Sequence, residues 1–238
     1  MRRTRRTAVA WLVAMSVATS LAMSVAAPSF ARAPWPDDFV GRLEALALVE
    51  TLNAELLAGR SATAVLEKWC ADHHMAAEPR IVAHVAPGVV APPGAEQRER
   101  LQIGAEDEVK YRRVALRCGE HTLSEADNWY VPARLTPEMN RALEASDAPF
   151  GKVIAPLRPF RRTFAVEMRW SPLPAGWESK TRATIMRERP KKEELEAPHA
   201  LFEHRAIVHG GDGKPISEVR ETYTNEILDF DAAAAREQ

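Results

Sequence analysis

The chain has 238 residues, of which 46% are hydrophobic, and 32 basic side chains stand against 33 acidic ones. This length suits one domain, or one domain with appendages. The charge balance argues against nucleic acid and against an anionic membrane surface as partners, because both attract chains with a basic excess.

Residues 1–33 have the order of a secretory signal. Four arginines precede an uncharged run over 7–30, and Ala26 and Ala31 offer cleavage sites. The arginine pair before the run also fits twin-arginine export. We therefore predict a signal peptide over 1–33 and a periplasmic or secreted protein with no membrane association after cleavage. An uncleaved anchor is the alternative, because the run is nearly long enough to span a bilayer. Cleavage lowers the basic residues from 32 to 27 against 33 acids, a net charge of −6.

Helical periodicity dominates the first part of the remaining chain. Leucines recur at helical spacing over 37–57, and Gly59 ends the pattern. Ser61 is a suitable N-cap for a second helix, whose inner side carries Leu66 and Trp69. A Thr-Pro-Glu start predicts a further short helix over 136–145.

Strand patterns follow the two helices. The expected strands, in chain order, are 80–85, 108–118, 122–131, 160–170, 201–209 and 214–228. Turn residues at 119–121 and 210–213 join two pairs of them as β-hairpins. This order predicts an α+β fold, an antiparallel β-sheet of about six strands with helices packed on one face.

Two segments stand apart from this pattern. Residues 171–199 contain four prolines and a dense run of mixed charge, which predicts a solvated charged insertion. The alanine-rich end, 231–238, predicts a disordered tail. We therefore expect a single domain over 34–230 that contains the insertion.

The chain has two cysteines, Cys70 in a predicted helix and Cys118 at the end of a predicted strand. An oxidising compartment permits a disulfide if the two meet in space. Otherwise they are two small buried hydrophobic residues. The histidines lack the spacing of metal ligands, and nucleotide-binding and hydrolase motifs are absent, so we expect no metal and no cofactor.

Charged residues alternate with apolar ones in two of the predicted strands. Glu221 lies on one face between Val219 and Tyr223, and Arg113 has apolar neighbours on its face of the strand 108–118. A buried carboxylate needs a partner, because an unpaired buried charge is costly. Arg113 and Glu221 in one pocket would bind a small anion with a polar group at its far end. The alternatives are a structural Arg–Glu pair and two solvated side chains.

Several short motifs follow one another in an order that resembles the chorismate lyase family. They are Ser61-Ala62-Thr63, Arg113 five residues before Cys118, Val131-Pro132, Pro149-Phe150-Gly151-Lys152, Gly213-Lys214-Pro215 and Glu221-Thr222-Tyr223. The resemblance covers roughly residues 45–230, with 171–199 outside it. It depends on the order of the motifs and on the match of Arg113 and Glu221 to the family's ligand-binding positions.

The resemblance implies a chorismate lyase-like fold, a six-stranded antiparallel sheet whose helices close ligand cavities. It implies a cofactor-free reaction in which chorismate loses pyruvate to give 4-hydroxybenzoate. Arg113 would then clamp the ring carboxylate, which suits a planar guanidinium. The backbone at Ala62 and Phe150 would enclose that end, and Glu221 would face the ring oxygen. A buried acid with a raised pKa could serve proton transfer in the elimination.

Three features separate this chain from the lyases. Ala62 stands where they have a larger methionine, Asn128-Trp129 stands where they have an Arg-Thr pair, and export would remove the protein from a cytosolic substrate. The same fold also occurs in ligand-sensing domains of GntR-type transcription regulators, which bind small molecules without turnover. The fold therefore does not settle the function.

Two functions remain open after this comparison. One is an exported lyase-like enzyme with Glu221 and Arg113 as catalytic residues, acting on chorismate or a related enolpyruvyl or aromatic carboxylate. The other is a non-catalytic periplasmic protein that binds an aromatic carboxylate through Arg113, Ala62, Phe150 and Glu221. A scaffold without a small-molecule pocket is a third interpretation. In each case we expect a monomer.

Overall fold

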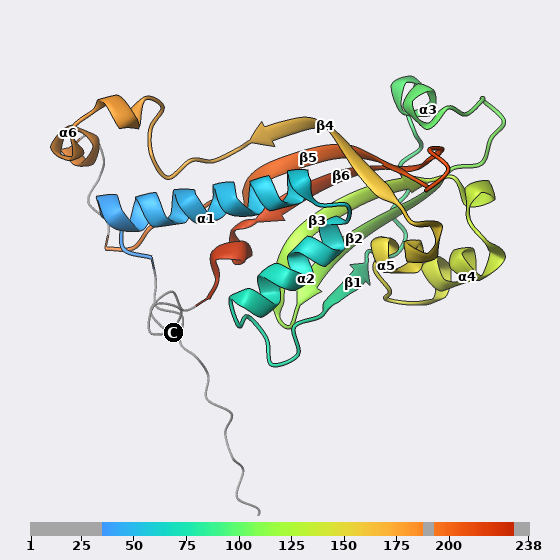
Figure 1. Ribbon diagram of the computed structural model, residues 1–238, viewed down its shortest axis with the longest axis horizontal. Helices are drawn as coiled ribbons and strands as arrows, with labels where there is room; N and C mark the ends of the chain where they lie inside the picture. The colour runs from blue at the N-terminus through green and yellow to red at the C-terminus, as the bar shows by residue number, and fades with distance from the viewer. Residues whose placement is uncertain (1–34, 188–192, 231–238) are drawn as a thin grey trace, which may run out of the picture. The chain divides into compact units, whose positions relative to one another are not determined.

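The computed structural model describes residues 35–187 and 193–230 (Figure 1). The predicted signal peptide, 1–33, and the predicted tail, 231–238, lie outside the described residues. None of the helices in the described ranges is both long and apolar enough to cross a membrane.

Six antiparallel strands form one sheet in the order β1-β2-β3-β6-β5-β4. They are β1 (Ile81–Val85), β2 (Lys110–Cys118), β3 (His121–Tyr130), β4 (Phe160–Met168), β5 (Ala200–His209) and β6 (Pro215–Thr224). The two expected hairpins are β2-β3 and β5-β6, and β6 joins them by pairing with β3. The predicted fold class is confirmed.

Helices accompany the sheet, and two of them, α2 and α4, begin at the predicted caps. They are α1 (Phe39–Ala58), α2 (Ala62–Asp72), α3 (Ala95–Leu101), α4 (Pro137–Ala145), α5 (Phe150–Val153) and α6 (Arg182–Arg187), with short 3-10 turns at Pro132–Arg134, Ala155–Leu157, Trp177–Ser179 and Asn225–Leu228. Ser61 Oγ accepts from the Ala64 amide, and Thr136 Oγ1 accepts from the Met139 amide. The helix α3 was not predicted: it lies between the strands predicted at 80–85 and 108–118, and since only Leu101 on it is buried, the segment shows no apolar periodicity.

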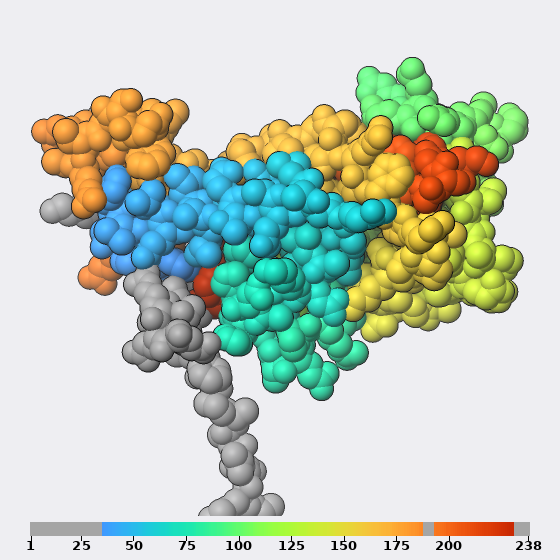
Figure 2. All heavy atoms as spheres, in the orientation of Figure 1, coloured from blue at the N-terminus to red at the C-terminus, as the bar shows by residue number. Residues whose placement is uncertain are grey.

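The helices α1 and α2 pack on one face of the sheet, which we call the inner face, and Figure 2 shows how much of that side they cover. The core between the layers includes Leu52 and Leu66 from the helices and Phe202 and Tyr223 from the strands. A disulfide between Cys70 and Cys118 links α2 to β2, with their Cα atoms 6.2 Å apart. Of the two possibilities left open by the sequence, this structure has the disulfide and not two separate cysteines.

The opposite side of the sheet, the outer face, is largely charged. One cross-strand row there runs Arg113, Asp127, Arg220 and Arg205 across β2, β3, β6 and β5. The neighbouring row on the inner face runs Val114, Ala126, Glu221 and His204 through the same strands. The alternation of side chains along each strand separates these two rows.

The described part of the segment 171–199 is folded against α1. Leu173, Ile185 and Leu195 are buried, and the Arg42 side chain on α1 donates to the Pro172 carbonyl at 2.7 Å. The prediction of a solvated insertion does not hold for Leu173, Ile185 and Leu195, whereas most other described side chains of the segment are exposed. Single apolar residues, Leu173, Ile185 and Leu195, fix the segment to the rest of the fold. They are spaced between charged residues, so the average composition of the segment does not indicate them.

Candidate functional site

A cavity of about 60 Å³ lies between the inner face of the sheet and the N-terminal ends of α2 and α5. Its walls are mainly apolar, with Val114, Ala126 and Val219 on the strands. Its few polar side chains are Arg60, Ser61, Thr63, Asn128, Arg161 and Glu221. A mostly apolar hollow with a few convergent polar groups is the usual form of a small-molecule site.

Close packing of α5 on α2 forms one wall of the cavity. A Cβ atom at Gly151 would lie 3.0 Å from Thr63 Oγ1 and 3.1 Å from Ser61 Oγ. A side chain at position 151 would therefore require Ser61 and Thr63 to move by a few tenths of an ångström, so glycine suits this close approach. The Ser61 cap uses the Ala64 amide, so the amides of Ala62 and Thr63 have no hydrogen-bond acceptor among the described residues. These free donors stand at the positive end of the α2 dipole.

A buried ion pair joins Arg161 on β4 to Glu221 on β6 at the cavity wall. The Arg161 guanidinium donates to Glu221 and, at 2.8 Å, to Thr163 Oγ1, and the Tyr223 hydroxyl donates to Glu221 at 3.3 Å. Burial lowers the pKa of Arg161, but the facing Glu221 and Tyr223 raise it overall. Burial, reinforced by the charge of Glu221, raises the pKa of Tyr223. Arg161 still has one unused donor, because its Nε is buried without a partner.

His204 connects this ion pair to α1. Its Nε2 lies 2.8 Å from Asn53 Oδ1, and its Nδ1 lies 3.5 Å from Arg161 Nη1. Since Asn53 Oδ1 can only accept, Nε2 carries the proton and Nδ1 accepts from the arginine, which is the neutral form of the ring. Burial and, second, the Arg161 charge lower the pKa of His204 to about 4.

Four further side chains on the inner face, Arg112, Asn128, Ser124 and Ser217, have buried polar atoms without a partner among the described residues. Asn128 lines the cavity, is 4% exposed, and its Oδ1 has no hydrogen-bond partner among the described residues. Arg112 lies directly opposite Asn128 on β2, and its Nε and Nη2 are also buried without partners. Burial lowers the pKa of Arg112. Buried polar atoms without partners are uncommon, and each requires an explanation.

The predicted site residues separate into two groups. Ala62, Phe150 and Glu221 line the cavity. Arg113 does not, because it lies on the outer face, where its side chain is 51% exposed and its Nε is 4.0 Å from Asp127 Oδ1. The prediction that Arg113 and Glu221 share one pocket is therefore wrong.

The physical reason for the error is the period of two along a strand. A shift of one position exchanges the faces, so Arg112, and not Arg113, points to the inner side. Arg161 is the cation that faces Glu221, and it lies on a different strand from the one considered. The sequence signal for Arg161 was a basic residue at an alternating position of the predicted strand 160–170. Its pairing with Glu221 could not be inferred from that signal, because the pairing depends on the order of the strands in the sheet.

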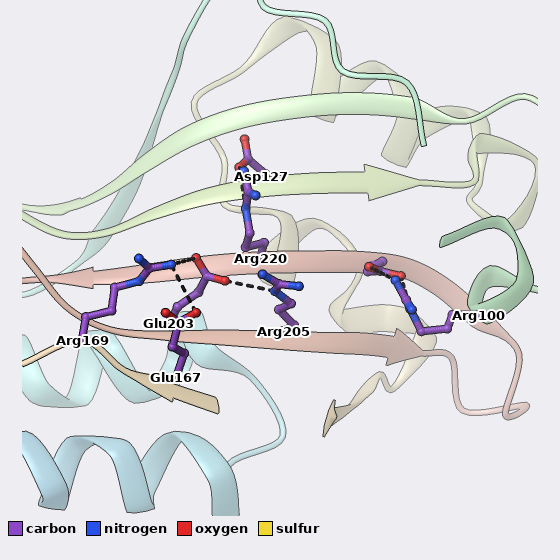
Figure 3. Close-up of polar contacts among 8 residues, drawn as sticks. Arg100, Asp127, Glu167, Arg169, Glu203, Arg205 and Arg220 are labelled. Carbon is purple, nitrogen blue, oxygen red and sulfur yellow. Dashed lines mark hydrogen bonds and ion pairs between the residues drawn. The ribbon is translucent and has the colours of Figure 1, made fainter. Parts of the chain in front are cut away.

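Charges on the outer face are paired, as Figure 3 shows. Glu203 lies between Arg169 and Arg205. Its Oε2 accepts from Arg169 Nη2 at 3.0 Å, and its Oε1 accepts from Arg205 Nε at 3.0 Å. Asp127 accepts from Arg220 Nε at 3.1 Å. The Glu218 carboxylate accepts two hydrogen bonds from Arg100, at 2.8 and 2.9 Å. These buried acids are satisfied by arginines whose other sides face solvent.

The fold and the cavity define a two-layer α+β protein with a small, partly polar hollow between sheet and helices. No family model matches the chain. The chain is 43% identical over 199 residues to the uncharacterized protein y4mC of Sinorhizobium fredii, which covers 83% of this chain and 82% of that protein. The chain belongs to the same family as y4mC.

Solved structures with a similar fold include ligand-binding domains of GntR-family regulators. The effector domain of PhnF from Mycobacterium smegmatis has 11% identity and a TM-score of 0.43, with 70% of this chain and 90% of that chain covered. A ligand-binding domain assigned to a GntR-family regulator of Bordetella bronchiseptica has 17% identity and a TM-score of 0.39, with 61% and 83% covered. YydK of Bacillus subtilis has 19% identity and a TM-score of 0.38, with 62% of this chain and 58% of that chain covered.

Proposed function

We propose that the cavity binds a small carboxylic acid and that the protein is an exported binding protein. The observation that carries the proposal is the set of unpaired polar groups around a mostly apolar hollow. Arg161 Nε and the amides of Ala62 and Thr63 are donors without acceptors among the described residues. A carboxylate would satisfy such donors, because arginine and helix N-termini both favour an anion.

Asn128 extends the site beyond the carboxylate. Its buried amide has an oxygen without a partner at the cavity wall. A ligand hydroxyl can donate to this oxygen or accept from the amide nitrogen, so it suits the side chain in either orientation. The proposed ligand class is therefore a carboxylic acid that also carries a hydroxyl group.

The size of the cavity limits the ligand. A cavity of roughly 150 Å³ holds benzene, whereas this one measures about 60 Å³. An acid with two or three carbon atoms suits the cavity as it stands. An aromatic carboxylate, the ligand expected from the sequence, would need α5 to move away from α2.

The place of action in this proposal is the periplasm or the exterior of the cell. The Cys70–Cys118 disulfide supports it, because such bonds persist mainly in oxidising compartments. The signal peptide predicted from the first 33 residues points the same way. A ligand taken up there would be an external acid and not a cytosolic intermediate.

A thermal-shift and calorimetric series of acids tests the proposal. Acetate, lactate and benzoate differ in size and in the hydroxyl group, and we expect saturable stabilisation by lactate above that by acetate. Asn128→Leu should remove this advantage without unfolding the protein. Arg113→Ala, on the outer face, is the matched control and should leave the response unchanged. A flat response to all three acids would contradict the proposal.

A lyase activity is a second candidate, and the position of Glu221 in the cavity wall favours it. Proton transfer by Glu221 requires it to separate from Arg161, which now neutralises it. Incubation with chorismate, followed by an assay for pyruvate, tests this function. Turnover that disappears in Glu221→Gln would support it, and an equal rate in both proteins would exclude Glu221 as a catalytic residue.

A further inference from the structure

The two edges of the sheet differ in how they are protected. The strand β1 has five residues, and the Ala83 amide on its free side donates to the Asp147 carbonyl at 2.9 Å. The strand β4 has nine residues and pairs only with β5 in the described part of the chain. Figure 1 shows β4 at the border of the sheet beyond β5. An edge of this length offers its free amides and carbonyls to another strand.

Apolar side chains on β4 are left uncovered. Phe164 is 45% exposed, and Val166 and Met168 are each 41% exposed. Phe164 lies on the outer side, where the Arg100 guanidinium is 4.8 Å from the centre of its ring. Val166 lies on the inner side, opposite His204 of β5. An edge strand with apolar side chains exposed on both faces is stabilised when a second strand pairs with its free edge, because cross-strand side-chain contacts then form.

A bulge in β4 makes the strand complementary to itself. The register to β5 shifts between Thr163 and Ala165, so Arg162 and Glu167 both point to the outer face although five positions separate them. In an antiparallel pair of β4 strands with the two-fold axis between Phe164 and Ala165, Arg162 of one copy faces Glu167 of the other. Each opposed pair then lies on a common face, as a continuous sheet requires.

We propose that two copies of this chain associate through the edges of β4 in that register. The occupant is a second copy because Arg162 and Glu167 carry opposite charges and exchange places under a two-fold rotation; Glu167 is 58% exposed beside Arg169 of its own chain, 3.4 Å away. Such a contact is isologous and closes after two subunits, which distinguishes it from open-ended aggregation. The proposal replaces the expectation of a monomer and is independent of the cavity.

Sedimentation velocity of the full chain over a wide concentration range tests the association. We expect a reversible dimer. Val166→Lys should weaken it by at least about tenfold, because a lysine on an edge strand disfavours pairing. Val90→Lys is the matched control, since Val90 is 83% exposed in a loop far along the chain from β4. A monomer at all concentrations, or equal effects of the two substitutions, would overturn the proposal.

Charge reversal tests the register. Arg162→Glu and Glu167→Arg each place like charges opposite one another across the two-fold axis and should weaken the dimer. The double variant restores opposite charges and should recover the original dissociation constant to within about threefold. Circular dichroism confirms that each variant is folded. A double variant that is as weak as the two single variants would overturn the proposed register.

Discussion

On the outer face of the sheet, each of the buried carboxylates Asp127, Glu203 and Glu218 has an arginine partner that reaches solvent. On the inner face, the helices exclude water, and polar atoms of Arg112, Asn128 and Arg161 have no partner among the described residues. The arginine partners therefore account for these three buried carboxylates of the outer face. The inner face retains groups whose presence is costly to stability, and this cost is the reason to look there for a ligand.

The largest expected difference between the faces concerns the removal of a carboxylate. Glu221→Gln leaves Arg161 buried without a counter-charge, and we expect a loss of about 3–5 kcal/mol of unfolding free energy. Glu203→Gln should cost about 1 kcal/mol, because Arg169 and Arg205 are 38% and 49% exposed and can rehydrate. Urea denaturation measures both values. Equal losses would contradict the contrast between the faces.

The disulfide tests how the inner face is held together. It closes a separation of 48 residues, for which the entropy of loop closure gives about 4 kcal/mol. We expect reduction, or replacement of Cys70 and Cys118 by serine, to lower the free energy of unfolding by about 3 kcal/mol. Because α2 supplies the free amides of the cavity, affinity for the acid should fall as well. Unchanged affinity in the serine variant would show that α2 keeps its position without the bond.

The pH dependence should be stronger on the inner face. The pKa of His204 is about 4 in the folded protein, against 6.5 for an ordinary histidine. At pH values between 4 and 6.5, His204 binds a proton in the unfolded chain but not in the folded protein. Stability is therefore fully present above pH 6.5 and decreases as the pH falls toward 4, by up to about 3 kcal/mol.

Thermal unfolding at several pH values measures this slope, and variants isolate the contribution of His204. His204→Gln keeps a donor for Asn53 and should remove most of the slope between pH 6.5 and 4. His199→Gln is the control, because this side chain is 58% exposed beside Glu125. If both variants retain the slope of the original protein, a different group on the inner face is responsible.

The sequence predicted the elements of this fold better than the positions of its charges. Strands and caps follow from local patterns, and the six strands and the Ser61 and Thr136 caps are confirmed. The pairing of Arg161 with Glu221 was not predictable in this way, because it depends on β5 lying between β4 and β6. The disulfide depends similarly on α2 crossing β2.

The assignment of Arg113 shows why local patterns can mislead within a strand. Tyr111 is one of the apolar neighbours from which Arg113 was expected to face a pocket, but its ring packs on Trp129 at 5.3 Å, and its hydroxyl donates to Asp127 on the outer face. Amphipathic aromatic side chains occupy either face of a half-charged sheet. With two arginines in succession, only the observed register decides which of them points inward.

That pair of arginines provides the smallest and most local test of the comparison. Arg112→Met removes a guanidinium with two unpaired buried nitrogens, and we expect a gain of about 1 kcal/mol in unfolding free energy. Arg113→Met alters a half-exposed side chain and should change it by less than about 0.5 kcal/mol. Urea denaturation of the two variants, which differ by one position, measures both. A loss of stability in Arg112→Met would mean that Arg112 already has a partner, and the contrast between the two faces would then no longer include this side chain.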